Sequence, residues 1–343
     1  MKRQMCWLAA SLVALGACSE MPAEGAPDGP DGELRSAAGA LLPASADWEI
    51  EADARAAQLG YRVDSGGDVD ADGHDDLLVT YPGHQNHGIR VGKVEVYDGS
   101  SQGTKTFPSW SLVGSIRNAR FGRAAAIVGD IDGDGYDDAV IGEPRYSNGE
   151  THEGRIHVYL GGSHGLAATG SRFESNGKRK HLGISVAPAG DVDGDGYDDV
   201  LIGSSYKRKN SSTFVEKAHL YLGSSSGLST SATLTVDAFR PQGDRRVAAV
   251  GVGDVDGDGI DDFAVGAPAA SPPNTTLYFG AKTGVGTRST EITGSSGSEF
   301  GSSVAPAGDV DADGYPDIVV GAPSDGQNHN GVARIYYGKS GGI

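Results

Sequence analysis

A nine-residue phrase rich in aspartate, D-x-D-x-D-G-x-x-D, occurs five times in the sequence. Carboxylates at positions 1, 3 and 5 of a tight loop can converge on one point, and glycine at position 6 permits the sharp turn. The carbonyl at position 7 and the carboxylate at position 9 can complete an oxygen shell suited to Ca²⁺. One copy could be a simple solvated turn, but five copies in register favour metal binding. The sequence therefore predicts up to five Ca²⁺ sites.

The predicted ligands of the first two sites are Asp68, Asp70, Asp72, His74 and Asp76, then Asp130, Asp132, Asp134, Tyr136 and Asp138. Those of the other three are Asp191, Asp193, Asp195, Tyr197 and Asp199, then Asp254, Asp256, Asp258, Ile260 and Asp262, then Asp309, Asp311, Asp313, Tyr315 and Asp317. The position-7 residues contribute a backbone oxygen, and the aspartates contribute carboxylates.

The residues after each phrase distinguish it from an EF-hand, which needs a bidentate glutamate at position 12. Position 12 is instead apolar and β-branched in all five copies: Val79, Ile141, Ile202, Val265 and Val320. Short β-branched runs are typical of buried strands and not of a flanking helix. Each loop therefore connects two strands.

The copies begin 62, 61, 63 and 55 residues apart, which indicates a repeat architecture. Each repeat is consistent with four strands: one before the loop (such as 300–305), one after it, a third that alternates (such as 155–161), and a fourth (such as 110–113). Four short strands in each repeat of about 60 residues are typical of propeller blades. The sequence predicts an all-β, five-bladed β-propeller.

The last repeat ends just past its third strand, so its fourth strand must come from elsewhere. Trp48 lies 20 residues before Asp68, as Trp110 lies 20 residues before Asp130. We therefore expect the segment from 47 to about 55 to complete the final blade by pairing with residues 333–337, which would remove the exposed sheet edges. The alternative places Trp48 in a disordered leader.

Phe121-Gly122 before a loop and Gly266-Ala267-Pro268 after one resemble the FG-GAP repeats of integrin α-subunit β-propellers and their bacterial relatives. The resemblance covers residues 47–343 and implies that the aspartates named above are Ca²⁺ ligands. It departs from the family pattern in three ways. Seven blades do not fit the repeat spacing, Arg245-Arg246 replaces Phe-Gly in the fourth repeat, and Gly203-Ser204-Ser205 replaces Gly-Ala-Pro in the third. Adhesion by the integrin mechanism is therefore not implied.

The N-terminus is typical of an export signal. Lys2 and Arg3 precede an apolar core at residues 7–15, and Leu15-Gly16-Ala17-Cys18 resembles the lipobox of bacterial lipoproteins. An ordinary secretory signal with an incidental cysteine is the alternative. We expect a signal peptide at 1–17, lipidation of Cys18, a flexible tether at 18–46 and the propeller at 47–343. The predicted location is the bacterial cell envelope, with a lipid as the only contact with the membrane.

The net charge is −18, but the five loops hold 24 of the 46 acidic residues. The rest of the propeller is net basic, with 25 Lys and Arg against 17 Asp and Glu. Three basic clusters belong to turns that we expect on the face opposite the acidic loops: Lys178, Arg179 and Lys180; Lys207, Arg208 and Lys209; and Arg245 and Arg246. Such a patch attracts polyanions, although long loops also carry charge for solubility.

The sequence lacks G-x-S-x-G, H-E-x-x-H and G-x-x-x-x-G-K-[ST] motifs. We therefore expect a monomeric binding or adhesion module, without catalytic residues, whose partner is a protein or an anionic glycan at the cell exterior. The alternative is a surface hydrolase or lyase that uses the propeller as a scaffold, since propeller enzymes draw their residues from separate blades. Nothing in the sequence indicates binding of nucleic acid.

Overall fold

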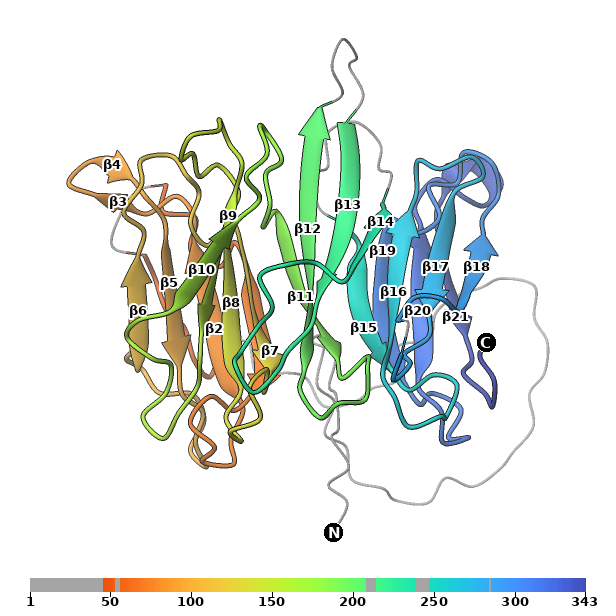
Figure 1. Cartoon of the computed structure of the whole chain (residues 1–343), viewed down its shortest axis with the longest axis horizontal. Helices are drawn as coiled ribbons and strands as arrows, with labels where there is room; N and C mark the ends of the chain where they lie inside the picture. The colour runs from red at the N-terminus through yellow and green to blue at the C-terminus, as the bar shows by residue number, and fades with distance from the viewer. Residues whose placement is uncertain (1–45, 53–55, 208–213, 239–246, 284) are drawn as a thin grey trace.

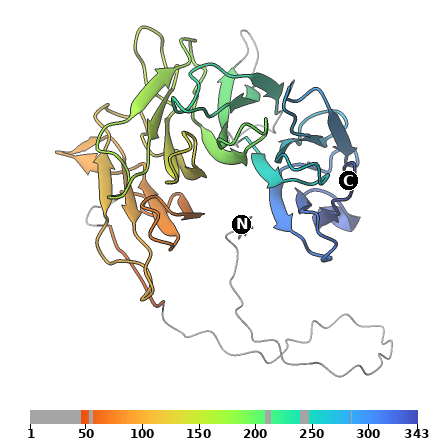
Figure 2. The same ribbon diagram turned by 60° about the horizontal axis from the view of Figure 1, so that its bottom comes forward.

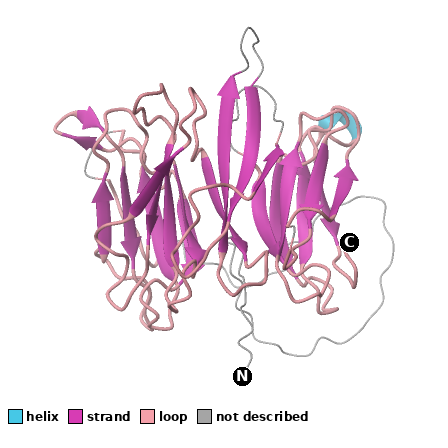
Figure 3. Cartoon of the chain, in the orientation of Figure 1, coloured by secondary structure: helices cyan, strands magenta, loops and turns pink. Residues whose placement is uncertain are grey.

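The computed structural model describes residues 46–52, 56–207, 214–238, 247–283 and 285–343. These residues form antiparallel β-sheets that stand side by side in an arc, as Figures 1 and 2 show from two directions. Loops join the strands throughout, and one short 3₁₀ turn lies at Gln327–His329 (Figure 3). The prediction of an all-β fold built from repeated four-stranded units is confirmed.

The first two sheets have four strands each, in sequence order. The first contains β1 (Val63–Gly67), β2 (Asp76–Tyr81), β5 (Lys93–Tyr97) and β6 (Trp110–Val113), with a small hairpin of β3 (Gln85–Asn86) and β4 (Ile89–Arg90) beside it. The second contains β7 (Ala124–Gly129), β8 (Asp138–Glu143), β9 (Arg155–Tyr159) and β10 (Ser171–Glu174).

The third sheet contains β11 (Ser185–Gly190), β12 (Asp199–Lys207), β13 (Phe214–Tyr221) and β14 (Leu234–Asp237). The fourth contains β15 (Ala249–Gly253), β16 (Asp262–Ala267), β17 (Asn274–Tyr278) and β18 (Ser289–Thr293). The fifth has three strands among the described residues: β19 (Ser303–Gly308), β20 (Asp317–Ala322) and β21 (Val332–Tyr336).

The first strand of every sheet ends in a register shift against the second, such as the one between Ile127 and Gly129. A bulge adds one residue and bends the strand. In this fold the bend comes directly before the aspartate-rich loop. The same irregularity therefore precedes all five loops.

The hydrophobic core is divided among the junctions between neighbouring sheets. Successive residues of a strand point to opposite faces, so Leu78 packs toward the second sheet while Leu77 and Val79 lie on the other face of the first. At the first junction, Leu78 shares a buried cluster with Ile141 and Tyr159 of the second sheet. The second, third and fourth sheets therefore each use one face to pack on the sheet before and the other to pack on the sheet after.

Glycine is required where two sheets meet most closely. A Cβ atom on Gly266 would lie 2.1 Å from the carbonyl oxygen of Gly301, and one on Gly301 would lie 2.5 Å from the carbonyl oxygen of Asn274. Gly301 also has a φ of 87°, which L-residues rarely adopt. The glycine of Phe-Gly thus packs on the glycine of the preceding Gly-Ala-Pro, which explains why the two motifs occur together.

The third sheet has longer central strands than its neighbours. Ser205 occupies the position at which each of the other four repeats has a proline: Pro82, Pro144, Pro268 and Pro323. Proline lacks the amide that the ladder needs. Without it, β12 continues to Lys207 and pairs with β13 from Tyr221 back to Phe214, so this hairpin projects beyond the others in Figure 1.

The predicted closure of the ring is wrong. Residues 47–52 form no strand and are not paired with β21, and residues 53–55 lie outside the described residues. The segment packs instead on the first sheet, where the Trp48 ring lies 5.2 Å from the Tyr97 ring. The first and fifth sheets are the two ends of the arc in Figure 2, and the apolar contacts of Trp48, Ile50 and Ala52 with the first sheet hold the segment there.

Candidate functional site

The five aspartate-rich phrases form the turns between the first and second strands of the five sheets. We call them acidic loops 1 to 5: residues 68–76, 130–138, 191–199, 254–262 and 309–317. In each loop the carboxylates at positions 1, 3 and 9 offer oxygen atoms that lie within 4.8 Å of one another. The clusters are Asp68, Asp70 and Asp76; Asp130, Asp132 and Asp138; Asp191, Asp193 and Asp199; Asp254, Asp256 and Asp262; and Asp309, Asp311 and Asp317.

The position-1 aspartate closes the turn. In acidic loop 2, Asp130 Oδ1 accepts from the amide of Asp134 at 3.1 Å, and Asp130 Oδ2 accepts from the amide of Gly135 at 2.8 Å. The equivalent pair of bonds is present in the other four loops. The sequence spacing therefore shapes the loop locally, before any cation is considered.

The position-9 aspartate is buried and ties the loop to the sheet. Asp138 Oδ2 accepts from the amide of Ile131 at 2.9 Å, and its Oδ1 accepts from the amide of Gly161 at 2.7 Å. Burial raises the pKa of Asp138 and of Asp199 to about 8, because the surroundings disfavour the charged form. A nearby cation would favour ionisation and offset that cost.

In two of the loops the position-3 aspartate has a buried oxygen atom whose hydrogen-bonding capacity is not satisfied. Asp132 Oδ1 and Asp193 Oδ1 are buried and have no hydrogen-bond donor. Burial and the neighbouring position-5 and position-1 carboxylates raise the pKa of both side chains. Since buried polar atoms are normally satisfied, a divalent cation among these oxygens fits the arrangement. Oxygen-only ligand sets of this kind suit hard cations.

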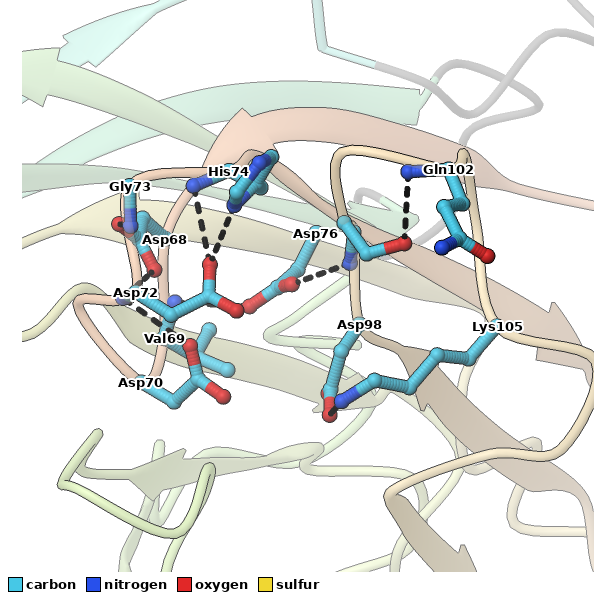
Figure 4. A network of polar contacts seen from close by, with 12 residues as sticks. Asp68, Val69, Asp70, Asp72, Gly73, His74, Asp76, Asp98, Gln102 and Lys105 are labelled. Atoms are coloured by element: carbon cyan, nitrogen blue, oxygen red, sulfur yellow. Dashed lines mark hydrogen bonds and ion pairs between the residues drawn. The ribbon is translucent and has the colours of Figure 1, made fainter.

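The position-5 aspartate lies outside the clusters of positions 1, 3 and 9 in all five loops. Asp134 Oδ1, for example, accepts from the amide of Tyr136 at position 7, at 3.1 Å. In acidic loop 1, Asp72 Oδ1 contacts both the amide and Nδ1 of His74 at 3.0 Å (Figure 4). The position-5 carboxylate thus bonds to the position-7 amide of its own loop. The role of these two positions as ligands stays a prediction.

An aspartate at position 8, which the sequence interpretation did not single out, links neighbouring loops. Asp198 Oδ2 accepts from the amide of Asp130 at 3.0 Å, and the amide of Asp198 donates to the carbonyl of Asp130 at 3.0 Å. We call this two-bond contact the interloop clasp. Asp137 forms it with Asp68, and Asp261 forms it with Asp191. The detectable signal was aspartate at position 8 in four of the five phrases.

The clasp is missing between acidic loops 4 and 5, because Pro316 occupies position 8 of loop 5. Proline has neither the carboxylate nor the amide that the contact needs. Acidic loop 4 also has a basic neighbour: Arg288 Nη1 donates to Asp256 Oδ2, and Arg288 Nη2 donates to the carbonyl of Gly341 at 2.7 Å. Sequence reasoning missed Arg288 because it lies 32 residues from Asp256.

A carboxylate from outside the phrase, that of Asp98, lies near acidic loop 1 (Figure 4). Asp98 is buried; its Oδ2 accepts from Lys105 Nζ at 2.8 Å, and its Oδ1 has no donor. The Asp98 charge helps to raise the pKa values of Asp70 and Asp76, after the larger effect of burial. Loop 1 thus combines an additional acidic group with a lysine.

Part of the predicted basic surface can be described. Lys178 and Arg179 are exposed in the turn before β11, and Lys207 is exposed at the end of β12. The two segments are adjacent, because the amide of Ser205 donates to the carbonyl of Lys180 at 2.9 Å and Lys180 Nζ lies 4.2 Å from the centre of the Tyr206 ring. Four predicted members lie outside the described residues: Arg208, Lys209, Arg245 and Arg246.

The predicted signal peptide at 1–17, the lipidation site Cys18 and nearly all of the tether at 18–46 also lie outside the described residues. Within the part of the chain that the structure covers, no helix has the length and apolar character needed to cross a bilayer.

Comparison with known proteins identifies the repeats. Residues 59–94 and 121–159 match the FG-GAP repeat family, and residues 191–265 and 254–320 match the FG-GAP-like repeat family. Over 238 residues, or 64% of this chain, the sequence is 30% identical to integrin alpha-PS2 of Drosophila melanogaster. Over 167 residues, or 46% of this chain, it is 31% identical to integrin alpha-5 of Xenopus laevis. Both matches cover 16% of the integrin.

A third relative is named as an enzyme. Phosphatidylinositol-glycan-specific phospholipase D of Rattus norvegicus is 31% identical over 160 residues, which cover 44% of this chain and 19% of that protein. The chain thus spans less than a fifth of the length of each of these relatives, and the similarity concerns the repeats. From the matched repeats, the five aspartate clusters and the sheet architecture together, the chain is an FG-GAP repeat protein of the integrin α-like type.

Proposed function

We propose that this protein is a Ca²⁺-binding module at the cell exterior, anchored through Cys18, that binds an anionic protein or glycan. One observation carries the cation assignment: acidic loops 2 and 3 each hold a buried position-3 oxygen without a donor, beside two further carboxylates. The integrin α-like repeats favour a binding or adhesion module over an enzyme.

Calcium is the divalent cation that the loops suit best. Ca²⁺ accepts six to eight oxygen ligands in flexible geometry, and it uses carboxylates together with backbone carbonyls. Mg²⁺ demands near-octahedral geometry and usually keeps several waters. A loop that converges three carboxylates and has a further carboxylate and a backbone carbonyl within reach is better matched to the larger ion.

Isothermal titration of the purified, metal-stripped protein tests this assignment. We expect several Ca²⁺ ions to bind per chain, with Mg²⁺ at equal concentration binding more weakly. An alanine at position 3 of one loop (Asp193→Ala) should remove one ion. A protein that binds neither ion would show that the loops are turns without a cation.

The partner would bind at the end of the sheets opposite the acidic loops. β12 begins at Asp199, which closes acidic loop 3, and runs to Lys207, so Lys207 lies at the far end of its strand. With Lys178 and Arg179 exposed nearby, this end presents positive charge to solvent. An anionic partner would be attracted, and the contact would weaken with added salt.

Retention on a sulfated or uronic-acid matrix and on an acidic peptide matrix tests the partner. We expect the triple variant Lys178→Ser, Arg179→Ser, Lys207→Ser to lose retention. The matched control, Lys282→Ser with Lys339→Ser, removes exposed lysines from the acidic-loop end and should be retained. Equal retention of the two variants would assign the basic residues to solubility, and the matrix that retains the parent separates glycan from protein.

The lipid anchor has its own test, because it involves a different segment. Cys18→Ser should release the protein from the membrane fraction of the producing cell while leaving Ca²⁺ binding unchanged. Continued membrane association of that variant would contradict the proposed anchor. It would not affect the assignment of the cation sites.

A further inference from the structure

The two ends of the arc carry the two halves of an interface that the chain already forms four times. Each internal junction packs one face of a sheet on the opposite face of the next. The fifth sheet has no following sheet and the first has no preceding one among the described residues. No sheet therefore covers either of the corresponding faces, and the residues near Trp48 cover that of the first sheet only in part.

The exposed fractions of apolar side chains show that no other described sheet covers the outer face of the fifth sheet. Position 2 of an acidic loop is fully buried at the four internal junctions, where Val69, Ile131, Val192 and Val255 are each 0% exposed, whereas Val310 is 52% exposed. Ile335 in β21 is 44% exposed. The residues in the same place of the other sheets, Val96, Val158, Leu220 and Leu277, are at most 2% exposed.

The first sheet lacks the complementary partner. Val63 is 58% exposed, whereas Ala125, at the same place in the second sheet, is 6% exposed. Val63, Leu77 and Val79 line a surface hollow together with Trp48 and Leu59. At the internal junctions the residues that correspond to Leu77 are buried in the cluster shared with the preceding sheet: Ala139, Val200, Phe263 and Ile318.

The polar groups of the two ends are also complementary. At the end of the first sheet, Asp75 occupies position 8 and is exposed, so it presents the carboxylate and amide half of an interloop clasp. At the other end, Asp309 presents the position-1 half. A second contact of the internal junctions runs from an amide three residues after the third strand to the position-2 carbonyl, as from Gly162 to Val69 at 3.0 Å. Its corresponding groups are Ser100 and Val310.

The segment around Trp48 supplies the remaining element. Trp48 Nε1 donates to the carbonyl of Lys105 and Trp110 Nε1 donates to that of Ala167, each 57 residues further along the chain. Both indoles meet a tyrosine ring edge-on, Tyr97 and Tyr159 respectively. Because Trp110 belongs to β6, residues 47–52 lie where the fourth strand of a preceding sheet would lie. Among the residues that the structure describes, the fifth sheet has three strands.

We propose that the uncovered face of the fifth sheet in one copy of this chain packs on the uncovered face of the first sheet in a second copy. The chain then associates head to tail, in place of the monomer expected from the sequence. In that contact β21 of one copy lies beside residues 47–52 of the other, and Asp309 of one meets Asp75 of the other. The two faces of one copy lie at opposite ends of the arc. Bringing them together within one chain would require the packing angles at the internal junctions to change.

The test uses the full chain in calcium, with Cys18→Ser in every sample to prevent lipid attachment. Sedimentation of the parent over a wide range of concentrations should show a mass above that of one copy. Ile335→Asp and Val63→Asp should each sediment as a single copy, since each destroys one half of the interface. Ile89→Asp is the matched control, because Ile89 is also 44% exposed but lies at the tip of the β3–β4 hairpin; it should associate like the parent.

Mixing the two interface variants distinguishes head-to-tail contact from a symmetric one. An Ile335→Asp copy keeps an intact first sheet and a Val63→Asp copy keeps an intact fifth sheet, so the mixture should form a complex of two copies and nothing larger. Circular dichroism should show all variants folded. A parent that has the mass of one copy at every concentration, or a mixture that stays entirely single, would overturn the proposal.

Discussion

Acidic loops 2 and 4 have nearly the same sequence but different neighbours. The phrases Asp130–Asp138 and Asp254–Asp262 differ at positions 2 and 7 alone. In loop 2 the position-3 carboxylate keeps an oxygen without a donor, and Asp198 joins the loop to the next one. In loop 4 Arg288 reaches the position-3 carboxylate, and Pro316 replaces the aspartate that would join loop 4 to loop 5.

The difference shows that the nine-residue phrase determines the conformation of the loop. Residues distant in the sequence determine how much of its negative charge is left for a cation to balance. Arg288 already brings a positive charge to Asp256, whose side chain is 2% exposed. A Ca²⁺ ion entering loop 4 must share or displace that contact, whereas loop 2 holds an unbalanced cluster. We therefore expect loop 2 to bind Ca²⁺ more tightly than loop 4.

Removing all bound Ca²⁺ should have the largest effect. A site occupied at a hundredfold excess over its Kd stabilises the folded state by about 2.7 kcal/mol, and several sites act together. We expect a chelator to lower the thermal midpoint markedly, as measured by calorimetry, and added Ca²⁺ to restore it. An unchanged midpoint would show that neither loop binds a cation that stabilises the fold.

Asp132→Ala should then separate the two loops. We expect it to remove one bound Ca²⁺ and about 2.7 kcal/mol of stability at a hundredfold excess over Kd, measured by titration and by denaturation in Ca²⁺. The matched change in loop 4, Asp256→Ala, should alter the Ca²⁺ count less because that carboxylate is paired with Arg288. Equal losses of Ca²⁺ would contradict the proposed ranking.

Asp198→Ala tests the clasp that joins loop 2 to loop 3, whose counterpart between loops 4 and 5 is missing. The change leaves the amide of Asp130 without its acceptor, and an unsatisfied partly buried donor costs about 1–3 kcal/mol. Urea denaturation in Ca²⁺, at dilutions where the chain is a single copy, should report this loss. Asp75→Ala provides the control, since Asp75 holds the same position but is exposed, and should change stability by less than about 0.5 kcal/mol.

Arg288→Gln should make loop 4 resemble loop 2. Removal of the guanidinium leaves Asp256 free to coordinate, and we expect the Kd of this loop for Ca²⁺ to fall about tenfold, or about 1.4 kcal/mol. Arg334→Gln is the control, because Arg334 also pairs with an aspartate (Asp325) and lies over a phenylalanine ring, away from the acidic loops. Similar Ca²⁺ titrations of the two variants would show that Arg288 does not compete with the cation.

Pro316→Asp should introduce the missing clasp at the fourth junction. The first three clasps each place the carboxylate beside the residue that precedes position 1, and Gly253 provides the same small residue here. We expect about 0.5–1.5 kcal/mol of added stability from the new hydrogen bonds, measured by urea denaturation. A loss of stability would indicate that the proline ring contributes more to this junction than the clasp would.

Local features were predictable from the sequence. The acidic loops, the strands that flank them and the Phe-Gly and Gly-Ala-Pro punctuation depend on groups a few residues apart, such as Asp130 and Gly135. The position-8 aspartates could not be understood in the same way, because Asp198 serves an amide 68 residues earlier. Arg288 was hidden for the same reason.

The Trp48 segment shows where correct local analogy led to an incorrect conclusion. The Trp48 indole packs as that of Trp110 does, because both meet a tyrosine ring and a carbonyl acceptor at the same place relative to the following sheet. This likeness did not predict strand pairing, since pairing also requires the fifth sheet to reach the first. The distance between the first and fifth sheets depends on the packing angle at every junction. The sequence of a single repeat therefore cannot determine it.

The sequence by itself determined the repeated unit: where each loop turns, which carboxylates converge, and which residues alternate between the two faces of a sheet. These properties follow from the spacing of aspartate, glycine and apolar residues within about 60 positions. The tertiary structure alone decided how the units differ, through Arg288 at loop 4 and the clasps that join loops 1 to 4, and whether the arc closes. Contacts between sheets set these outcomes, and small changes in packing angle add up along the arc.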